Sequence, residues 1–486
     1  MIVFYIVAFL IQHYYFYTTT NILQNQYYDI KRFFYYKMKN KPLLIIKILL
    51  VLLSCILIKI NKIFYILSFF YFFDLLKNKI IKFKFTKRVI RQLILFEIIN
   101  AFTLLITILF NQILLSILLN AIIYWFSFAI SCFVEKIIQE YYKVKAIKKV
   151  KKYNIKIIAI TGSYGKTSVK NYVYELIKEK YNVLMTPKSF NTLNGVLLTI
   201  NNELKPYHEF LILEIGVDKK NGMNKFIKLF PFYISVVTAI GPQHLKTFKT
   251  MDNIKIEKLK IFTNATYCIV MNLDDKYIKD YTATIKSFTV SSNDEMANLI
   301  VNSFKDKNND NILKIINDKK VYYAKTSLLG KHNIMNLSLA IAVAIILNIN
   351  MESIIKNIEC LENVKHRLYL VKKENWIIID DSYNSNYEGM LNAIDVLKEF
   401  TGFKVIITPG IIEAKLSDMQ NSKIANKINE NIDLALLINH PAFENKIDKK
   451  LAFISFKKAY SYLESNYKKE KLILLIANDL PDIYLN

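Results

Sequence analysis

Residues 157–170 read IIAITGSYGKTSVK, and this stretch decides the fold of the chain around it. The apolar, mostly β-branched run Ile155–Ile160 predicts a buried parallel strand. A glycine-containing turn, Thr161–Gly165, then leads directly into Lys166, Thr167 and Ser168. Apolar residues follow at helical spacing, at Val169, Val173, Leu176 and Ile177.

A strand, a loop and a helix in this order are typical of a phosphate-binding loop. Successive backbone N–H groups and a helix N-terminus point at a polyanion, Lys166 adds a positive charge, and the Thr167 hydroxyl can ligate Mg²⁺. The general pattern has glycine where Ile160 stands, and the alternative is an ordinary turn. The stretch therefore predicts a site for ATP and Mg²⁺.

The composition separates the N-terminal part of the chain from the rest. Of the 486 residues, 53% are hydrophobic and 14% aromatic, and the excess lies mainly before the phosphate loop, which indicates a membrane. The four cysteines are scattered without disulfide or zinc spacing, which fits a reducing compartment for the polar part.

Five apolar stretches precede the phosphate loop, at 1–17, 43–58, 63–76, 93–110 and 113–134. Basic residues follow the first, third and fifth, so the positive-inside rule predicts a multi-pass protein of the plasma membrane with cytoplasmic catalytic domains. The second and third stretches could instead form one re-entrant hairpin. Glu97 and Asn100 lie in the fourth, where a functional role and a helix-to-helix hydrogen bond are both open.

The formal charge of +26 raises the question of nucleic acid. Lysine is abundant along the whole chain, which argues against one nucleic-acid-binding face, and residues 1–152 hold 22 Lys/Arg against 5 Asp/Glu. Most of the excess thus flanks the apolar stretches, and membrane lipids are the predicted partner rather than nucleic acid.

The predicted fold class is α/β. An α-helical membrane region, residues 1–134, is followed by a basic juxtamembrane linker, 135–152, which we expect to lie along the membrane surface. Strands then alternate with helical patterns, which predicts an ATP-binding domain with a parallel sheet at 153–360 and a Rossmann-like C-terminal domain at 361–486. The predicted strands are 210–213, 234–237, 268–271, 376–379, 404–408, 434–438 and 471–476.

Polar residues that follow predicted strands form the candidate site. Glu214 ends the strand FLILE beside the phosphate loop, where the Mg²⁺ of a nucleotide is expected. His244 and Asn272 also come just after apolar strands, although a lone histidine is more often a structural residue and Asn272 could equally belong to a simple turn. Lys258 could belong to a solvated helix face, and His332 could merely cap a helix.

The order of ten short motifs resembles the Mur ligases, the ATP-dependent amide ligases of peptidoglycan precursor synthesis. The motifs are TGSYGKTS, SFNTLNG, LEIG, QHL, EKLKIF, NLDD, LLGKHNIMN, HRL, DDSYNSN and TPGIIE. The resemblance covers about residues 153–486. Within the family, the chain is most similar to the branch that adds D-alanyl-D-alanine to a UDP-linked muramoyl tripeptide. The resemblance also implies a complete C-terminus.

The resemblance implies a role for each matching residue. Lys166, Lys258 and His244 would be catalytic, with Lys258 carbamylated. Thr167, Glu214 and His244 would bind metal, and Asn191 and Thr192 would meet the peptide substrate. The implied ATP-binding residues are Gly162, Ser163, Tyr164, Gly165, Lys166, Thr167, Ser168, Asn272, His332, Asn333, Arg367 and Asp381.

Three departures from the family pattern bear on function. Lys260 stands where an acidic residue is usual, Tyr387 replaces a proline, and apolar stretches replace the domain that grips the UDP-sugar. The main hypothesis is an ADP-forming ligase that joins an amino acid or dipeptide, D-alanyl-D-alanine at best guess, to a peptidoglycan precursor through an acyl phosphate. The alternatives are a ligase for a lipid-linked or polymeric, poly-γ-glutamate-like acceptor, and an inactive membrane scaffold or transporter.

Overall fold

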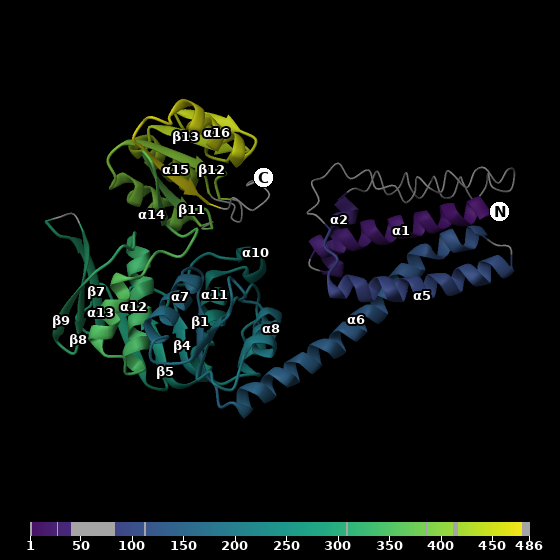
Figure 1. Ribbon diagram of the computed structural model, residues 1–486, viewed down its shortest axis with the longest axis horizontal. Coiled ribbons are helices and arrows are strands. Elements are labelled where there is room, and N and C mark those ends of the chain that lie inside the picture. The colour runs from purple at the N-terminus through teal and green to yellow at the C-terminus, as the bar shows by residue number, and fades with distance from the viewer. Residues whose placement is uncertain are drawn as a thin grey trace. The chain divides into compact units, whose positions relative to one another are not determined.

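The structure is a computed structural model, and it describes residues 2–26, 28–39, 83–110, 113–307, 310–383, 386–411 and 417–478. The chain divides into two compact units, residues 1–141 and 142–486 (Figure 1). In its described residues the first is helical, and the second carries two β-sheets.

The N-terminal unit packs its helices around aromatic side chains. Phe16, Phe96 and Tyr124 are buried together, and the Tyr124 hydroxyl lies 3.0 Å from the Thr20 hydroxyl. Glu97, which falls in the fourth apolar stretch, pairs with His13 at 2.6 Å. The helices are α1 (Ile2–Asn25), α2 (Ile30–Lys39), α5 (Lys87–Leu109) and α6 (Ile113–Lys152).

Two helices in the described part of the chain are long and apolar enough to cross a membrane, at residues 87–109 and 119–152. They pass by length and composition only, which is weak evidence for spanning. The apolar stretches at 43–58 and 63–76 lie outside the described residues. The five spans of the sequence-based prediction are therefore not supported.

The larger sheet has the strand order β2-β3-β1-β4-β5-β6-β7-β8-β9. Pairing is parallel from β2 to β7, and β7, β8 and β9 form an antiparallel extension. The strands are β1 (Lys156–Thr161), β2 (Val183–Met185), β3 (Phe210–Glu214), β4 (Phe232–Val237), β5 (Ala265–Asn272), β6 (Ser287–Ser291), β7 (Leu299–Lys305), β8 (Asn311–Asn317) and β9 (Lys320–Lys325).

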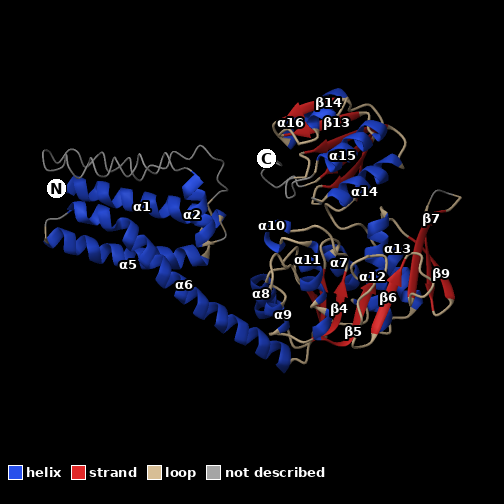
Figure 2. Ribbon diagram, turned by 180° about the vertical axis from the view of Figure 1, so that it is seen from behind, coloured by secondary structure: helices blue, strands red, loops and turns tan. Residues whose placement is uncertain are grey.

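Helices cover both faces of this sheet because its strands are apolar on both sides (Figure 2). Ile158 and Ile160 pack against α7, α12 and α13, while Ile157 and Ala159 pack against α8 and α11 on the opposite face. The helical segments of this domain are α7 (Lys166–Ile177), α8 (Leu193–Glu203), α9 (Asn224–Ile227), α10 (Leu245–Phe248), α11 (Met251–Leu259), η2 (Phe262–Asn264), α12 (Lys331–Ile346) and α13 (Met351–Glu359).

The basic segment 135–152 does not form a separate surface helix. It is the last part of α6, and Ala146 and Val150 are buried with the apolar residues of α8. Lys149 Nζ donates to three carbonyl oxygens at the end of α8, those of Ile200, Asn201 and Leu204, at 3.3, 2.8 and 3.1 Å. Because those carbonyls lack helical partners, the lysine caps α8. The sequence-based expectation for this segment did not include its packing against α8.

The second sheet has the order β10-β11-β15-β12-β13-β14, parallel except for the edge strand β10. Its two faces are covered by α14 and α15 on one side and α16 on the other. The elements are β10 (Tyr369–Lys373), β11 (Trp376–Asp381), α14 (Tyr387–Lys398), β12 (Phe403–Thr408), α15 (Asp418–Asn431), β13 (Leu434–Ile438), η3 (Glu444–Lys446), β14 (Lys450–Phe453), α16 (Phe456–Asn466) and β15 (Leu472–Ala477).

Candidate nucleotide-binding site

The predicted phosphate loop lies where the strand order of the larger sheet reverses. β1 pairs with β3 on one side and β4 on the other, so the loop that follows β1 opens at the point where parallel α/β sheets bind ligands. Gly165 takes φ +79° directly before α7. A Cβ there would also come within 2.2 Å of Asn336 Oδ1, so only glycine fits. Thr167 and Ser168 form the first turn of α7.

The loop after β4 holds the phosphate loop in place. Ser163 N donates to Ala239 O at 2.7 Å, and Ser163 Oγ exchanges hydrogen bonds of 2.9 Å with both the N–H and the carbonyl of Gly241. Thr238 Oγ1 donates to the carbonyl of Tyr164. Burial also raises the pKa of Tyr164. The loop is therefore fixed by the fold before any nucleotide binds, as a preorganised anion site requires.

Two lysines meet at one carbonyl of this loop. Lys166 Nζ donates to Gly162 O at 2.8 Å and to Ser163 O at 3.2 Å. Lys258, from α11, also donates to Gly162 O at 2.8 Å, although its side chain is only 1% exposed. Burial, and then the charge of Lys166, lowers the pKa of Lys258 well below its usual value. Sequence reasoning left Lys258 open to a solvated helix face, and the structure buries it at the phosphate loop.

Glu214 lies at the end of β3 and is also 1% exposed. Its Oε1 accepts from Asn191 Nδ2 at 3.2 Å, whereas its Oε2 is buried without a hydrogen-bond partner. Lys170 Nζ stands 3.3 Å from that Oε2. Burial lowers the pKa of Lys170, and the Glu214 carboxylate opposes this effect. A buried carboxylate oxygen without a hydrogen bond, beside a phosphate loop, fits the oxygen ligand that Mg²⁺ takes.

The predicted substrate loop is close to this carboxylate. Asn191 binds Glu214 through its side chain and Gly216 N through its backbone carbonyl, at 2.8 Å. The Thr192 hydroxyl accepts from Gly195 N at 3.3 Å and caps α8. The structure therefore brings Asn191 to the candidate site and gives Thr192 a helix-capping role.

His244 does not join a cluster of metal ligands. It is exposed, has φ +55°, and precedes the short helix α10. Across the residues that the structure describes, no group of three or more His, Cys, Asp or Glu side chains could hold a metal ion. The second-metal role of His244 stays a prediction.

Asn272 is engaged by the backbone around it. Its Nδ2 donates to Thr238 O at 2.9 Å, and its Oδ1 accepts from Asp274 N at 3.0 Å. The neighbouring Asp275 accepts from Ile240 N at 2.7 Å, and burial raises the pKa of its carboxyl. These contacts join the loops after β4 and β5 beside the phosphate loop.

A chain of hydrogen bonds runs from α12 into the second sheet. Asn333 Nδ2 donates to Asn363 Oδ1 at 3.1 Å, and Asn363 Nδ2 donates to Leu368 O at 2.7 Å. Leu368 N then donates to Asp381 Oδ1 at 3.1 Å. The predicted nucleotide residues Asn333 and Asp381 are thus brought into one network, which uses their side chains to connect the two sheet-bearing parts.

His332 and Arg367 contribute the remaining charges. His332 Nδ1 is buried without a hydrogen-bond partner, and burial, with a smaller effect from Arg367, lowers its pKa to about 4. The Arg367 guanidinium lies 5.3 Å from the centre of the Tyr383 ring, and the Tyr383 hydroxyl donates to Ser189 Oγ at 3.1 Å. Sequence reasoning did not include Lys170, Asn363 and Tyr383 in the site. Of these, only Lys170 could have been predicted, because it lies four residues, or one helical turn, after Lys166.

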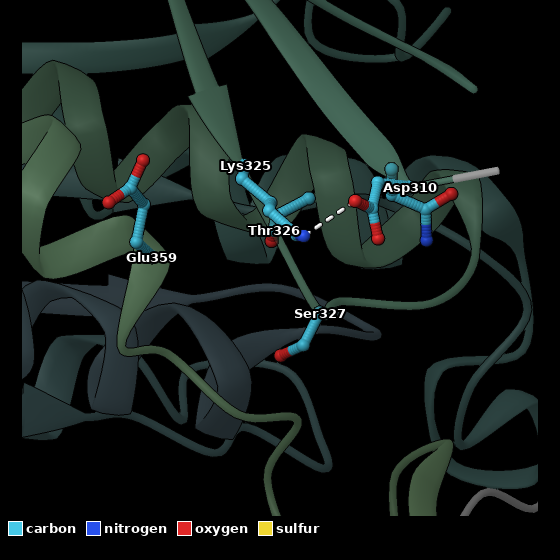
Figure 3. A pocket seen from close by; sticks show the side chains of 6 residues that line it. Asp310, Lys325, Thr326, Ser327 and Glu359 are labelled. Atoms are coloured by element: carbon cyan, nitrogen blue, oxygen red, sulfur yellow. Dashed lines mark hydrogen bonds and ion pairs between the residues drawn. The ribbon is translucent and has the colours of Figure 1, made fainter. Parts of the chain in front are cut away.

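A polar pocket of about 410 Å³ lies elsewhere, at the start of β8 and the end of β9 (Figure 3). Lys325 pairs there with Asp310 at 2.5 Å, and Asn311, Thr326, Ser327 and Glu359 also line the pocket. None of the predicted site residues lines this pocket, so it does not alter the candidate site.

Comparison with known proteins gives a consistent result. A family profile described as the Mur ligase middle domain matches residues 160–344. The UDP-N-acetylmuramoyl-tripeptide–D-alanyl-D-alanine ligase of Buchnera aphidicola subsp. Baizongia pistaciae is 29% identical over 67% of this chain and 70% of its own. The ligase of the same name from Escherichia coli is 25% identical over 53% of this chain and 58% of its own.

Solved structures share the fold. A MurF ligase from Thermotoga maritima in complex with ADP superposes with a TM-score of 0.63 at 22% identity, over 70% of this chain and 80% of its own. MurF from Acinetobacter baumannii gives 0.62 at 20% identity, over 69% of this chain and 76% of its own. The parallel-sheet α/β architecture is therefore confirmed.

The comparisons also correct the predicted localisation. These relatives are cytoplasmic enzymes, and the two apolar helices of the described residues are weak evidence for membrane spans. The prediction of a multi-pass protein of the plasma membrane was wrong, because apolar stretches of this length and composition do not by themselves establish membrane spans. The predicted partnership with membrane lipids is likewise unsupported.

Proposed function

The chain belongs to the Mur ligase family, and from this premise we propose that it joins D-alanyl-D-alanine to the peptide of a UDP-linked peptidoglycan precursor. The family consists of ATP-dependent, ADP-forming amide ligases that use ATP and Mg²⁺, and the chain is such a ligase. The observation that supports the dipeptide as substrate is the name of the relatives, which match the chain over about two thirds of its length.

The proposed reaction has two steps that balance without a protein nucleophile. An oxygen of the peptide carboxylate attacks the γ-phosphorus of ATP, ADP leaves, and an acyl phosphate forms. The amine of the dipeptide then attacks the acyl carbon, phosphate leaves, and the amine loses a proton. The products are an amide, ADP and phosphate. Such transfer depends on positioning and charge stabilisation.

The phosphate loop supplies the charge stabilisation. Lys166 would turn from the carbonyls of Gly162 and Ser163 to the β- and γ-phosphates, since their oxygens are stronger acceptors for an ammonium. The N–H groups of residues 164–167 would bind the phosphates at the start of α7. Thr167 and Glu214 would hold Mg²⁺, which neutralises charge on the phosphates when bound.

Lys258 is the proposed site of carbamylation. Burial, and then the charge of Lys166, lowers the pKa of Lys258 and so favours the unprotonated amine, the form that can add CO₂. The product would carry a negative charge beside Lys166 at the Gly162 carbonyl, where it attracts the Lys166 ammonium. His244 would serve a second metal near this group.

The nucleoside end of ATP is proposed to lie against α12 and the second sheet. His332, with its unpartnered Nδ1, and Arg367 would make direct contacts. Asn333 and Asp381 would shape the same site through the network that joins them, and Asn272 through its hydrogen bond to Thr238 O.

The test compares acceptors for the purified full chain with ATP and Mg²⁺. UDP-N-acetylmuramoyl tripeptide with D-alanyl-D-alanine should give equimolar ADP, phosphate and an amide of the expected mass. Lipid-linked and poly-γ-glutamate acceptors should give none. The proposal fails if the lipid-linked or the poly-γ-glutamate acceptor is consumed while the UDP-linked tripeptide is not. It also fails if Lys166→Ala makes amide at the wild-type rate.

A further inference from the structure

Lys170 is a buried ammonium with a fixed position. It lies on α7, one turn after Lys166, and its side chain is 1% exposed. Its Nζ donates to Thr186 O at 2.9 Å and to the carbonyl of Lys188, so two of its three N–H groups are held by the backbone before the substrate loop. The same Nζ stands 3.3 Å from Glu214 Oε2, the oxygen without a hydrogen bond.

The other oxygen of Glu214 belongs to the same arrangement. Oε1 accepts from Asn191, which follows the carbonyls that hold Lys170 by only a few residues. The two oxygens of Glu214 thus contact Lys170 and Asn191. Lys170 is itself held by the segment 186–191, and Asn191 belongs to that segment. Because both Lys170 and Glu214 are fully buried, water screens little of the interaction between them.

We propose that Lys170 is a positioning residue that compensates the charge of Glu214, so that a divalent cation binds there strongly only together with a nucleotide. This inference rests on the proposed role of Glu214 as a metal ligand. A bare divalent cation would approach a carboxylate that already has a cation beside it, and the two positive charges repel. Nucleotide phosphates add the negative charge that overcomes this repulsion.

A purely structural role makes the opposite prediction for the variants. If Lys170 served only to hold the segment 186–191, then its removal would loosen Glu214 and Asn191 and weaken every form of metal binding. If it compensates charge, its removal strengthens binding of the bare cation. Linkage then requires that the nucleotide's effect on cation affinity and the cation's effect on nucleotide affinity decrease by the same factor.

The experiment is a titration of the full chain with Mn²⁺, followed by the electron paramagnetic resonance signal of free Mn²⁺, with and without ADP. Mn²⁺ is the probe because it takes oxygen ligands as Mg²⁺ does. We expect Lys170→Met to bind Mn²⁺ about tenfold or more tightly than wild type without ADP, with a correspondingly smaller effect of ADP. Lys170→Arg, which keeps the charge, should behave like wild type.

Lys170→Gln is a second uncharged variant, needed if the methionine disturbs the fold, because glutamine can still donate a hydrogen bond to a carbonyl. Thermal unfolding shows which variants are folded. Equal or weaker Mn²⁺ binding by folded Lys170→Met or Lys170→Gln without ADP overturns the inference. Glu214→Gln separates the two hypotheses. If it leaves Mn²⁺ binding with ADP unchanged, the proposed metal site itself fails; if it weakens that binding, only the role of Lys170 is at issue.

Discussion

The carboxyl edges of the two parallel sheets use charged residues in different ways. At the edge of the larger sheet, Lys170, Glu214 and Lys258 are buried around the phosphate loop, and Lys258 and Glu214 Oε2 are left with fewer partners than they can bind. At the edge of the second sheet, Asp381 is equally buried, but it accepts from Leu368 N in a network of amides.

This difference indicates that the charged residues of the first edge serve the reaction, whereas the polar residues of the second edge fix the geometry of the fold. Buried charges with unused bonding capacity are costly to stability and are retained where a ligand completes them. Buried polar groups in a complete network fix the geometry of the parts they join. We therefore expect substitutions at the first edge to affect turnover more than stability, and substitutions at the second edge to affect stability more than turnover.

The largest effect is expected for Lys166→Ala. Loss of a preorganised cation at the phosphates should lower the rate of ADP formation by about 10²–10³-fold, with little change in unfolding by urea. The control is Lys178→Ala, at the exposed C-cap of the same helix, where the lysine pairs with Glu175 far from the phosphate loop. A comparable loss of rate in that variant would show that α7 as a whole, rather than Lys166, had been disturbed.

Lys258→Met tests whether the buried lysine at the first edge serves stability. Because methionine removes a buried amine that has only a carbonyl partner in the described contacts, the free energy of unfolding should change by less than about 1 kcal/mol or rise. Phosphate release should nevertheless fall at least tenfold. The matched control is Lys255→Met on the same helix. A destabilisation of several kcal/mol would instead assign Lys258 to the fold.

Asn363→Ala tests the second edge. The change leaves Leu368 O and Asn333 Nδ2 each with one partner fewer, so the free energy of unfolding should fall by about 1–3 kcal/mol. Urea unfolding measures it, with Asn293→Ala in an exposed turn as the control. Turnover at saturating substrate and low temperature should change less than in Lys258→Met; the reverse order would contradict the division between the edges.

The smallest effect concerns His332 and pH. Its folded pKa of about 4 lies below the ordinary value of 6.5, so the unfolded chain binds a proton that the folded chain does not between these values. The contribution is fully present above pH 6.5 and is lost as pH falls toward 4. Between pH 7 and pH 5, wild type should lose about 1–2 kcal/mol more stability than His332→Gln. Equal losses in urea unfolding at the two pH values would show that His332 does not titrate this way.

The strands that consist of an uninterrupted apolar run were predicted most accurately from the sequence. The strands at 210–213, 234–237 and 434–438 were each found within two residues of their predicted bounds, because both faces of a parallel sheet are buried. β8 and β9 were missed, since Lys314 and Lys320 break the apolar pattern on an antiparallel extension with one exposed face. The predicted membrane localisation was wrong, because the length and hydropathy of one or two helices are weak evidence for a membrane span.

At the site, the spacing of the phosphate-loop motif predicted that Lys166 lies at the start of a helix. The end of an apolar strand predicted that Glu214 lies at the carboxyl edge of the sheet. Spacing could not show that Lys258 reaches the Gly162 carbonyl from α11, nor that Asn363 joins Asn333 to Leu368. Those contacts connect residues far apart in the chain, and no local pattern records them.

The lysine that caps α8 has a practical consequence for making shorter versions of the protein. A chain that starts at Tyr142 keeps Ala146, Lys149 and Val150, and with them the cover over one face of the larger sheet. A chain cut at the apparent start of the catalytic part, Tyr153, would lose all three and expose apolar residues of α8 to solvent. For crystallisation or screening, the useful boundary therefore lies inside a helix rather than at the end of it.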